Sequence, residues 1–373
     1  MKKQLILKIF FTFIILTLVS CSDPIFKTIS QEEKQLEPHV KGSPTNFVEF
    51  NSKMYVASGT TLYRYDGTKS GKPSEGNWYD IPNVGKNGII RQLAVTNNVM
   101  YVLCGESGQN VLRKSSNGTS WSDVHVNDDI LVQSVYGVNN QLFIGAGTNN
   151  VYSIYKYDGS NFEFLIATEN RLLNGAASNG TSYFLIAKDL GSNTGSTYSY
   201  DGINTNSITN LGNTSFMGII SLGSQIVAIS RNGFLFYITT NILQTGHKLN
   251  SSSSNLFATG ALAIWTAPHT SNKLLLAGRQ DGMNFSVNYL QGYQELELDS
   301  SGNIISGASF RDPGINPSLS TVNDNASYKT NMEKNPVNHL HQAGDGILFA
   351  ATQAKGVWSY RQRGDRWLWN AEQ

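Results

Sequence analysis

The chain repeats one short pattern along most of its length. A turn of asparagine, serine or glycine precedes an apolar strand, and the next strand ends in Tyr-Asp-Gly with an aromatic residue behind it. Two clear copies begin at Asn51-Ser52 and Asn139-Asn140, and Tyr65-Asp66-Gly67 and Tyr157-Asp158-Gly159 end their later strands. A unit of this size cannot bury its own apolar face, so the copies must pack against one another.

The turn that precedes the apolar strand occurs seven times. The first six turns follow one another at intervals of 40 to 48 residues, which is the length of a four-stranded propeller blade. Small residues within the apolar strands suit blades that converge near an axis. The sequence therefore predicts an all-β fold, a seven-bladed β-propeller of four-stranded blades over residues 46–373. The turns are Asn51-Ser52, Asn97-Asn98, Asn139-Asn140, Asn179-Gly180, Gly223-Ser224, Ser271-Asn272 and Gly344-Asp345-Gly346.

Other turns should join the third and fourth strands of the blades. Asp66-Gly67, Asp158-Gly159 and Asp201-Gly202 are predicted as hairpin turns, because glycine accepts positive φ and aspartate caps its own turn. The second unit instead has Ser115 to Trp121. This stretch resembles the Asp-box of sialidase-like propellers, in which a polar side chain bonds the loop and the tryptophan packs beneath it. Residues 356–370 predict the last hairpin, set beside the first blade near Phe47–Phe50.

The sixth and seventh turns lie 73 residues apart, well above the other intervals. The excess falls at about residues 300–336. Part of it should complete the sixth blade, and the rest is an insertion across one face. Such an insertion either carries binding function, as surface loops often do, or is a decorative loop.

The N-terminus has the pattern of an export signal. Lys2, Lys3 and Lys8 precede the apolar run Ile9–Val19 and give the N-terminus a positive charge. The run is too short to span a membrane. Residues 1–20 are therefore predicted as a signal peptide. Leu18-Val19-Ser20-Cys21 resembles the bacterial lipobox, which implies cleavage before Cys21 and acylation of that cysteine. An ordinary signal peptide is the alternative.

Residues 21–45 are polar with scattered prolines, and they are predicted to be the lipidated cysteine and a flexible tether. Several acyl chains on one cysteine would hold the protein firmly to a membrane. By resemblance to enteric lipoproteins, serine rather than aspartate at position 22 favours the outer membrane.

Charge and cysteine content narrow the kinds of partner that can be expected and the roles that the two cysteines can have. Loss of the leader lysines leaves 25 basic and 27 acidic residues, a net charge of −2, and no long run of one sign occurs. Nucleic acid is therefore not an expected partner. With Cys21 acylated, Cys104 is alone among small strand residues, so we expect a buried structural thiol and no disulfide.

Several short patterns invite a functional interpretation. Arg363-Gly364-Asp365 matches the integrin-binding tripeptide, but it stands where other units have hairpin turns. His339 and His341 would share one face of a strand, with no third ligand nearby in sequence.

Phe310–Pro313 is similar to a short sialidase motif. Its third residue differs from that motif, which in sialidases lies near the start of the chain. Trp78, Tyr136, Trp265 and Tyr289 could form an aromatic platform for sugars, although packing between blades explains most of them better.

The lipobox, the tether, the seven units and the ending Ile347–Glu372 together resemble the β-propeller lipoproteins of spirochaetes, especially treponemes. The resemblance implies a location and a shape, and it transfers no catalytic residue. We therefore expect an envelope-anchored, non-enzymatic binding or scaffold module without cofactor or metal. It would be a monomer whose partner is a protein or a glycan. The alternatives are a carbohydrate-binding or glycan-active propeller, with its site at the axial opening, and a periplasmic scaffold for assembly of outer-membrane proteins.

Overall fold

The computed structural model describes most of the chain after residue 37. The described ranges are 38–85, 88–106, 109–126, 130–148, 151–208, 214–239, 241–249, 256–267, 273–281, 292–311, 336–363 and 366–372. All regular elements in these ranges are β-strands. Within them there is therefore no helix long and apolar enough to cross a membrane.

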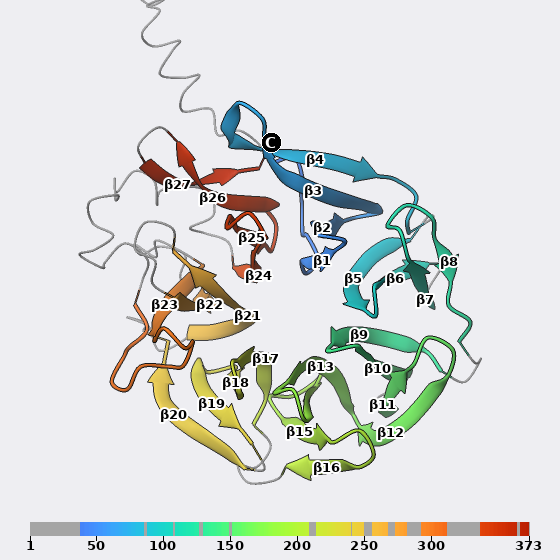
Figure 1. The fold of residues 1–373 in the computed structure, drawn as a ribbon. Coiled ribbons are helices and arrows are strands. Elements are labelled where there is room, and N and C mark those ends of the chain that lie inside the picture. Colours follow the sequence, from blue (N-terminus) through green and yellow to red (C-terminus); the bar gives the residue numbers. More distant parts are fainter. Residues whose placement is uncertain are drawn as a thin grey trace, which may run out of the picture. The chain divides into compact units, whose positions relative to one another are not determined.

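In the described part of the chain, seven antiparallel sheets stand in a ring (Figure 1), which confirms the predicted seven-bladed β-propeller. Each blade is consecutive in sequence, and its first strand lies innermost. Blade 1 has β1 (Val48–Phe50), β2 (Lys53–Ser58), β3 (Thr61–Lys69) and β4 (Lys72–Ile81). Blade 2 has β5 (Ile89–Thr96), β6 (Val99–Glu106), β7 (Gln109–Ser115) and β8 (Ser122–Asp123). Blade 3 has β9 (Val132–Val138), β10 (Gln141–Thr148), β11 (Val151–Tyr157) and β12 (Phe162–Glu169).

The remaining blades follow the same order around the ring. Blade 4 has β13 (Arg171–Ser178), β14 (Tyr183–Asp189), β15 (Gly195–Tyr200) and β16 (Thr205–Ile208). Blade 5 has β17 (Phe216–Leu222), β18 (Gln225–Ser230), β19 (Phe234–Ile238) and β20 (Ile242–Lys248). Blade 6 has β21 (Leu256–Thr266), β22 (Lys273–Asp281) and β23 (Tyr293–Leu298). Blade 7 has β24 (Val337–Gln342), β25 (Leu348–Thr352), β26 (Val357–Arg363) and β27 (Arg366–Ala371).

Blade 6 differs from the others because its fourth strand is reduced to isolated bridges. Glu295 and Arg311 exchange both backbone N–H···O bonds at 2.9 Å, and Leu298 bridges Ile304. Phe310 is fully buried in the core shared with blade 5. The first part of the expected insertion, residues 300–311, is therefore the outer layer of blade 6. Residues 312–335 lie outside the described residues.

The predicted turns between first and second strands fall where they were expected in six blades, while that of blade 6, Ser271-Asn272, lies outside the described residues. Asn51 and Ser52 both adopt positive φ, as do Asn97 with Asn98 and Asn139 with Asn140, the geometry of tight hairpins. Asp158-Gly159 and Asp201-Gly202 join third to fourth strands. The prediction for Asp66-Gly67 was wrong. That pair lies inside β3 at a break in its pairing with β4, and the hairpin turns later, at Ser70-Gly71.

The Asp-box-like stretch of blade 2 forms the expected side-chain-bonded turn between β7 and β8. Ser115 Oγ accepts the N–H of Gly118 at 2.8 Å, and Asn117 Oδ1 accepts those of Thr119 and Ser120 at 2.9 and 2.8 Å. Trp121 packs on the core below it. The turn is thus held by its own side chains.

The hydrophobic core lies between blades, as the short repeat requires. Each of seven clusters joins two neighbouring blades, the last of them blades 7 and 1. The second strands are its centre, and Val56, Val102, Ile144 and Val227 are each 0% exposed. Cys104 belongs to the cluster between blades 1 and 2 and is also fully buried, as expected for a structural thiol.

Near the axis the blades approach so closely that side chains are excluded. A Cβ on Gly218 would lie 2.1 Å from the carbonyl oxygen of Gly260 in the next blade, and a Cβ on Gly137 would lie 2.2 Å from that of Val95. The inner strands of blades 2 to 7 also share a β-bulge at the same point of their pairing. The extra residues are Arg91, Gln133, Asn174, Met217, residues 259–261 and Asn338. A bulge bends a strand and re-aims its side chains.

Hydrogen bonds near the axis tie several neighbouring blades together. Ser134 Oγ donates to the carbonyl of Leu173 at 2.8 Å, and Asn174 Nδ2 donates to that of Phe216 at 3.0 Å. Between blades 1 and 2, Asn46 both donates to and accepts from the backbone of Leu93. The axis is therefore held by a repeated set of polar contacts.

The packed body begins earlier than the sequence suggested. Residues 38–45 were expected to belong to the tether, but Val40 is 0% exposed between blades 7 and 1. The carbonyls of Val40 and Gly42 accept the backbone N–H groups of Val357 and Gly356 at 3.0 and 2.8 Å. This segment therefore lies along blade 7, although the chain then enters blade 1. Residues 1–37, which include the predicted signal peptide and Cys21, lie outside the described residues.

Candidate functional site

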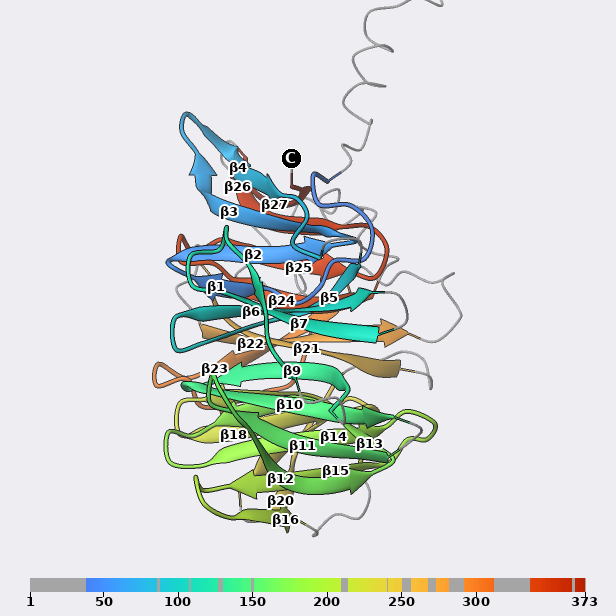
Figure 2. The same ribbon diagram turned by 90° about the vertical axis from the view of Figure 1, so that its right-hand side faces the viewer.

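Antiparallel order gives the ring two faces that carry different strand connections. First-to-second and third-to-fourth strand turns share one end, here called the turn face. Second-to-third turns and the connections between blades share the other, here called the loop face. Figure 2 shows the ring from its edge, with strands running from one face to the other. Segment 38–45 contacts Ser58 and Gly356, at second-to-third turns, so the N-terminal segment joins the body on the loop face.

The centre of the turn face is rich in uncharged polar groups. Asn51, Asn97, Asn98, Asn139 and Asn140 are exposed there. Some also link blades: Asn97 Nδ2 donates to the Asn140 carbonyl at 2.9 Å, and the Tyr183 hydroxyl donates to the Asn139 carbonyl at 3.1 Å. The turns are therefore held in place while their amides remain accessible. Such a surface can donate and accept hydrogen bonds without a strong charge.

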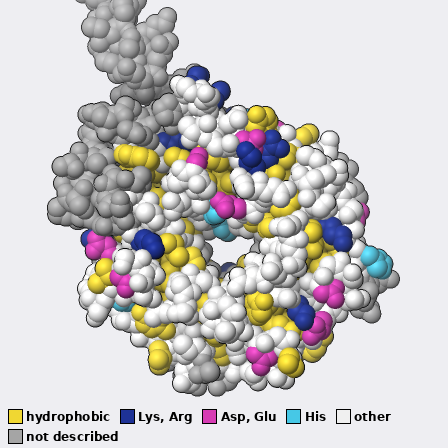
Figure 3. Space-filling model, viewed as in Figure 1, with side chains coloured by type: hydrophobic (Ala, Val, Ile, Leu, Met, Phe, Trp, Pro, Cys, Tyr) yellow, Lys and Arg dark blue, Asp and Glu magenta, His cyan; other side chains and the backbone are white. Residues whose placement is uncertain are grey.

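A central opening passes through the ring and is visible in Figure 3. At its turn-face end, Glu49 of β1 and His341 of β24 face each other across the seam between blades 1 and 7, with 3.4 Å from Oε1 to Nε2. The ring of His341 stacks on Phe47. The bond to His341 lowers the pKa of Glu49. This is a half-exposed pair of a carboxylate and an imidazole at the rim of the opening.

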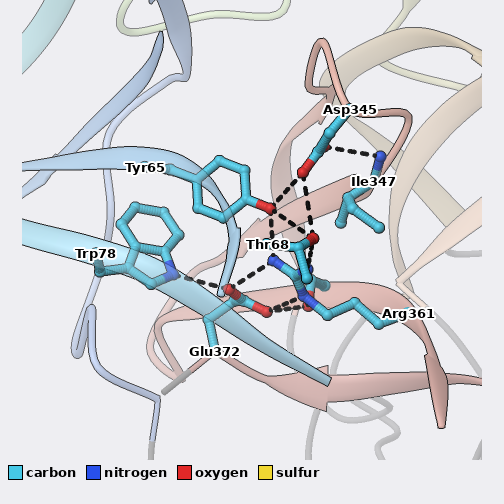
Figure 4. A network of polar contacts seen from close by, with 8 residues as sticks. Tyr65, Thr68, Trp78, Asp345, Ile347, Arg361 and Glu372 are labelled. Carbon is cyan, nitrogen blue, oxygen red and sulfur yellow. Dashed lines mark hydrogen bonds and ion pairs between the residues drawn. The ribbon is translucent and has the colours of Figure 1, made fainter. Parts of the chain in front are cut away.

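The same seam holds a buried polar network (Figure 4). Arg361 Nε donates to Glu372 Oε1 at 2.6 Å, and Arg361 Nη2 donates to the Tyr65 hydroxyl at 2.9 Å. That hydroxyl in turn donates to Asp345 Oδ2 at 2.5 Å, and Trp78 Nε1 donates to Glu372 Oε2 at 2.7 Å. Desolvation raises the pKa of Tyr65, so it remains a neutral donor. Because Arg361, Glu372 and Tyr65 are buried and satisfy one another's hydrogen bonds, their role is to close the ring.

Arg363-Gly364-Asp365 falls between the last two strands. Arg363 ends β26 and pairs with Arg366, which begins β27, while Gly364 and Asp365 lie outside the described residues. Cys21, the expected lipidation site, lies outside them as well.

The two histidines of β24 do not share a site. His341 contacts Glu49, whereas desolvation lowers the pKa of His339 to about 4. Among the described residues, no group of three or more His, Cys, Asp or Glu side chains is placed to hold a metal ion. Of the sialidase-like stretch, Phe310 is core and Arg311 Nη2 bonds Glu297 at 2.5 Å.

The possible aromatic platform does not form among its described members, as the preference for packing between blades predicted. Trp265 is 2% exposed in the core between blades 6 and 7, and Trp78 bonds Glu372 at the closing seam. Tyr136 packs against the core between blades 3 and 4. Tyr289 lies outside the described residues. Packing between blades thus accounts for the three described members.

Sequence reasoning missed the Glu49–His341 pair and the Arg361–Glu372 network. The partners of each come from opposite ends of the chain, so no local pattern marks them. The predicted contact of the last hairpin with the first blade was the one sequence signal that pointed to this seam.

Comparison with known proteins supports the architecture. No protein-family model and no curated protein matches the chain. A solved structure described as YCF48 bound to D1 peptide is 11% identical, covers 91% of this chain and 94% of its own, and has a TM-score of 0.55. A streptogramin B lyase is 12% identical with a TM-score of 0.55, covering 88% of this chain and 97% of its own. A chain of a mitotic checkpoint complex is 10% identical with a TM-score of 0.53, covering 88% and 94%.

At these identities the likeness shows the fold alone: the chain is a seven-bladed β-propeller. One of these propellers is named as a lyase, and another was solved with a peptide. The fold therefore supports unrelated functions, and function must be argued from this chain's own surface.

Proposed function

We propose that this protein is a non-enzymatic binding module of the bacterial cell envelope, anchored by lipid on Cys21, whose turn face receives a protein partner. The observation that carries the proposal is the path of segment 38–45. It joins the body on the loop face, through the contacts of Val40 and Gly42 with Val357 and Gly356. An anchor at Cys21 would therefore hold the loop face toward the membrane.

The proposed tether is long enough for the propeller to meet a partner at some distance from the membrane. Residues 22–37 are sixteen residues. At about 3.5 Å per residue they span at most roughly 55 Å when extended. The turn face would then point away from the bilayer. Its accessible asparagine amides match the hydrogen-bonding groups of a polypeptide backbone. The outer membrane is the proposed location, and the partner is a protein of the envelope or of a surface that meets it.

The anchor is tested by metabolic labelling with a clickable fatty acid. Wild-type protein should take the label and fractionate with membranes, and Cys21→Ala should lose both properties. A Cys104→Ala variant is the matched control, because Cys104 is buried and should keep them. Labelling of Cys21→Ala would contradict the anchor. Protease shaving of intact cells separates a surface orientation from a periplasmic one.

The docking face is tested by placing bulky charges on one face at a time. Thr181→Arg with Ser224→Arg alters exposed residues of the turn face, and Thr60→Arg with Ser192→Arg alters exposed residues of the loop face. In-cell photo-crosslinking should recover a partner with wild type and the loop-face variant but not with the turn-face variant. The reverse pattern would place docking on the loop face.

A hydrolysis screen on glycans and esters tests the non-enzymatic assignment, and turnover would contradict it.

A further inference from the structure

A cavity of about 410 Å³ lies between blades 2 and 3, at the outer part of the turn face and away from the central opening. This volume is within the range of small-molecule sites in proteins. Its walls come from the end of β7, from β8 and the residue pair after it, and from the turn between β11 and β12. The lining includes Lys114, Asp123, His125, Tyr157, Asn161 and Phe162.

Lys114 lines this cavity and forms no ion pair with any described residue. Its Nζ donates to the carbonyl of Gly159 at 3.2 Å, which leaves two of its three N–H donors for a ligand. The carboxylates nearby are already engaged. Asp123 accepts from Arg113 Nε at 2.8 Å, and Glu163 pairs with Lys156 at 2.7 Å. The site therefore presents an ammonium group to an anion.

One wall of the cavity is aromatic. The rings of Tyr157 and Phe162 lie 4.6 Å apart, and Tyr101 meets Tyr157 edge-on at 6.1 Å. The Tyr157 hydroxyl donates to the Gly159 carbonyl at 2.7 Å, which fixes that ring, and Phe162 remains partly exposed. The partly exposed ring of Phe162, packed against the fixed ring of Tyr157, offers a surface for the C–H groups of a ligand.

The turn that frames the cavity is built before any ligand arrives. Asp158 Oδ1 accepts the N–H groups of Ser160 and Asn161 at 2.8 and 2.7 Å, and these bonds lower the pKa of Asp158. The exposed side chains of Ser160 and Asn161 are thereby set at the rim. A hydroxyl and an amide, set rigidly beside an aromatic ring, suit a ligand that carries several hydroxyl groups.

We propose that this cavity binds an acidic sugar unit, a hexuronate. Its carboxylate would meet Lys114, its C–H face would lie on Phe162, and its hydroxyls would bond Asn161 and Ser160. A sugar that bears one negative charge supplies the anion for Lys114, the C–H face for the aromatic ring and the hydroxyl groups for the rim. A neutral sugar would leave Lys114 without an anion, and a small carboxylate would leave the aromatic wall uncovered. The site is independent of protein docking at the centre of the turn face.

The test is a titration of the full-length mature protein with glucuronic acid, galacturonic acid, glucose and acetate, followed by ligand-observed NMR. A uronic acid should bind about tenfold more tightly than glucose or acetate. Lys114→Met should weaken uronate binding about tenfold, and Lys114→Arg should retain it. Phe162→Ala should weaken it as well. Lys72→Met, at an exposed lysine paired with Glu75 in blade 1, is the matched control and should bind as wild type does.

Each alternative outcome overturns the assignment. If glucose bound as tightly as both uronates, the carboxylate would have no role in binding. If acetate bound as tightly as the uronates, the sugar ring would have no role. Unchanged binding by Lys114→Met would place the site elsewhere. Thermal unfolding checks that the variants are folded. If Phe162→Ala is not folded, Asn161→Ala tests the same rim, since its exposed side chain lies outside the core.

Discussion

Arg361 Nε lies 2.6 Å from Glu372 Oε1, with Arg361 0% and Glu372 1% exposed. Both residues belong to the last blade, yet they also bond Tyr65 and Trp78 of the first. In the described chain, blades 1 and 7 share no strand, because every sheet is built from consecutive strands. Side chains and segment 38–45 therefore close this ring.

Breaking this pair should destabilise the whole protein. Arg361→Met leaves the Glu372 carboxylate buried without its cation, which costs about 3–5 kcal/mol. Urea unfolding should show the loss. Lys72→Met, which breaks an exposed pair with Glu75, should change stability by less than about 1 kcal/mol. Equal effects of the two substitutions would contradict the closing role of Arg361.

The axial contact between blades 5 and 6 should not tolerate even a methyl group. Gly218→Ala would set a Cβ 2.1 Å from the Gly260 carbonyl oxygen, so backbone must move, at a cost of about 1–3 kcal/mol. Gly344→Ala is the matched control, because the nearest atom there is 4.0 Å away. Thermal unfolding compares the two variants. A Gly218→Ala protein as stable as Gly344→Ala would show that the seam is loose.

The start of the folded body can be located by truncation. A chain that begins at Pro38 should unfold as the mature protein does. A chain that begins at Asn46 loses buried Val40 and the acceptors for the N–H groups of Gly356 and Val357. That loss should cost about 3 kcal/mol or more. Equal denaturant midpoints for the two truncated chains would mean that segment 38–45 adds nothing to stability.

Stability should fall with acidity through His339. Desolvation lowers the pKa of His339 in the folded protein to about 4, below its ordinary 6.5. Between these values the unfolded chain binds more protons, so stability is fully present above about pH 6.5 and declines as pH falls toward 4. The decline is at most about 1.4 kcal/mol per pH unit.

Urea unfolding between pH 5 and 7 measures this slope, and His339→Leu should flatten it. The window lies above the ordinary pKa of Glu49, which is lowered further in the fold, so that carboxylate contributes little there. An NMR titration of the native protein in which His339 gains its proton near pH 6.5 would contradict the prediction.

Local patterns predicted the fold well because the propeller is a sum of similar, sequential hairpins. Asn97-Asn98 and Asn139-Asn140 favour tight turns locally, since asparagine tolerates positive φ. The error at Asp66-Gly67 has the same origin. The pair can turn a chain, but β3 continues to Lys69 and pairs with β4 beyond it, so pairing between strands overrode the local preference.

The number of blades, their order and the burial of their second strands depend on residues close together in the chain, so local sequence patterns predicted them. The start of the folded body, the junction of blades 1 and 7 and the side chains that meet at a surface depend on closure of the ring, so they were found in the structure. Val40 with Val357, Glu49 with His341, and Arg361 with Tyr65 are each separated by almost the whole chain. Contacts of that kind arise from the closing of the ring, and no local period in the sequence encodes them.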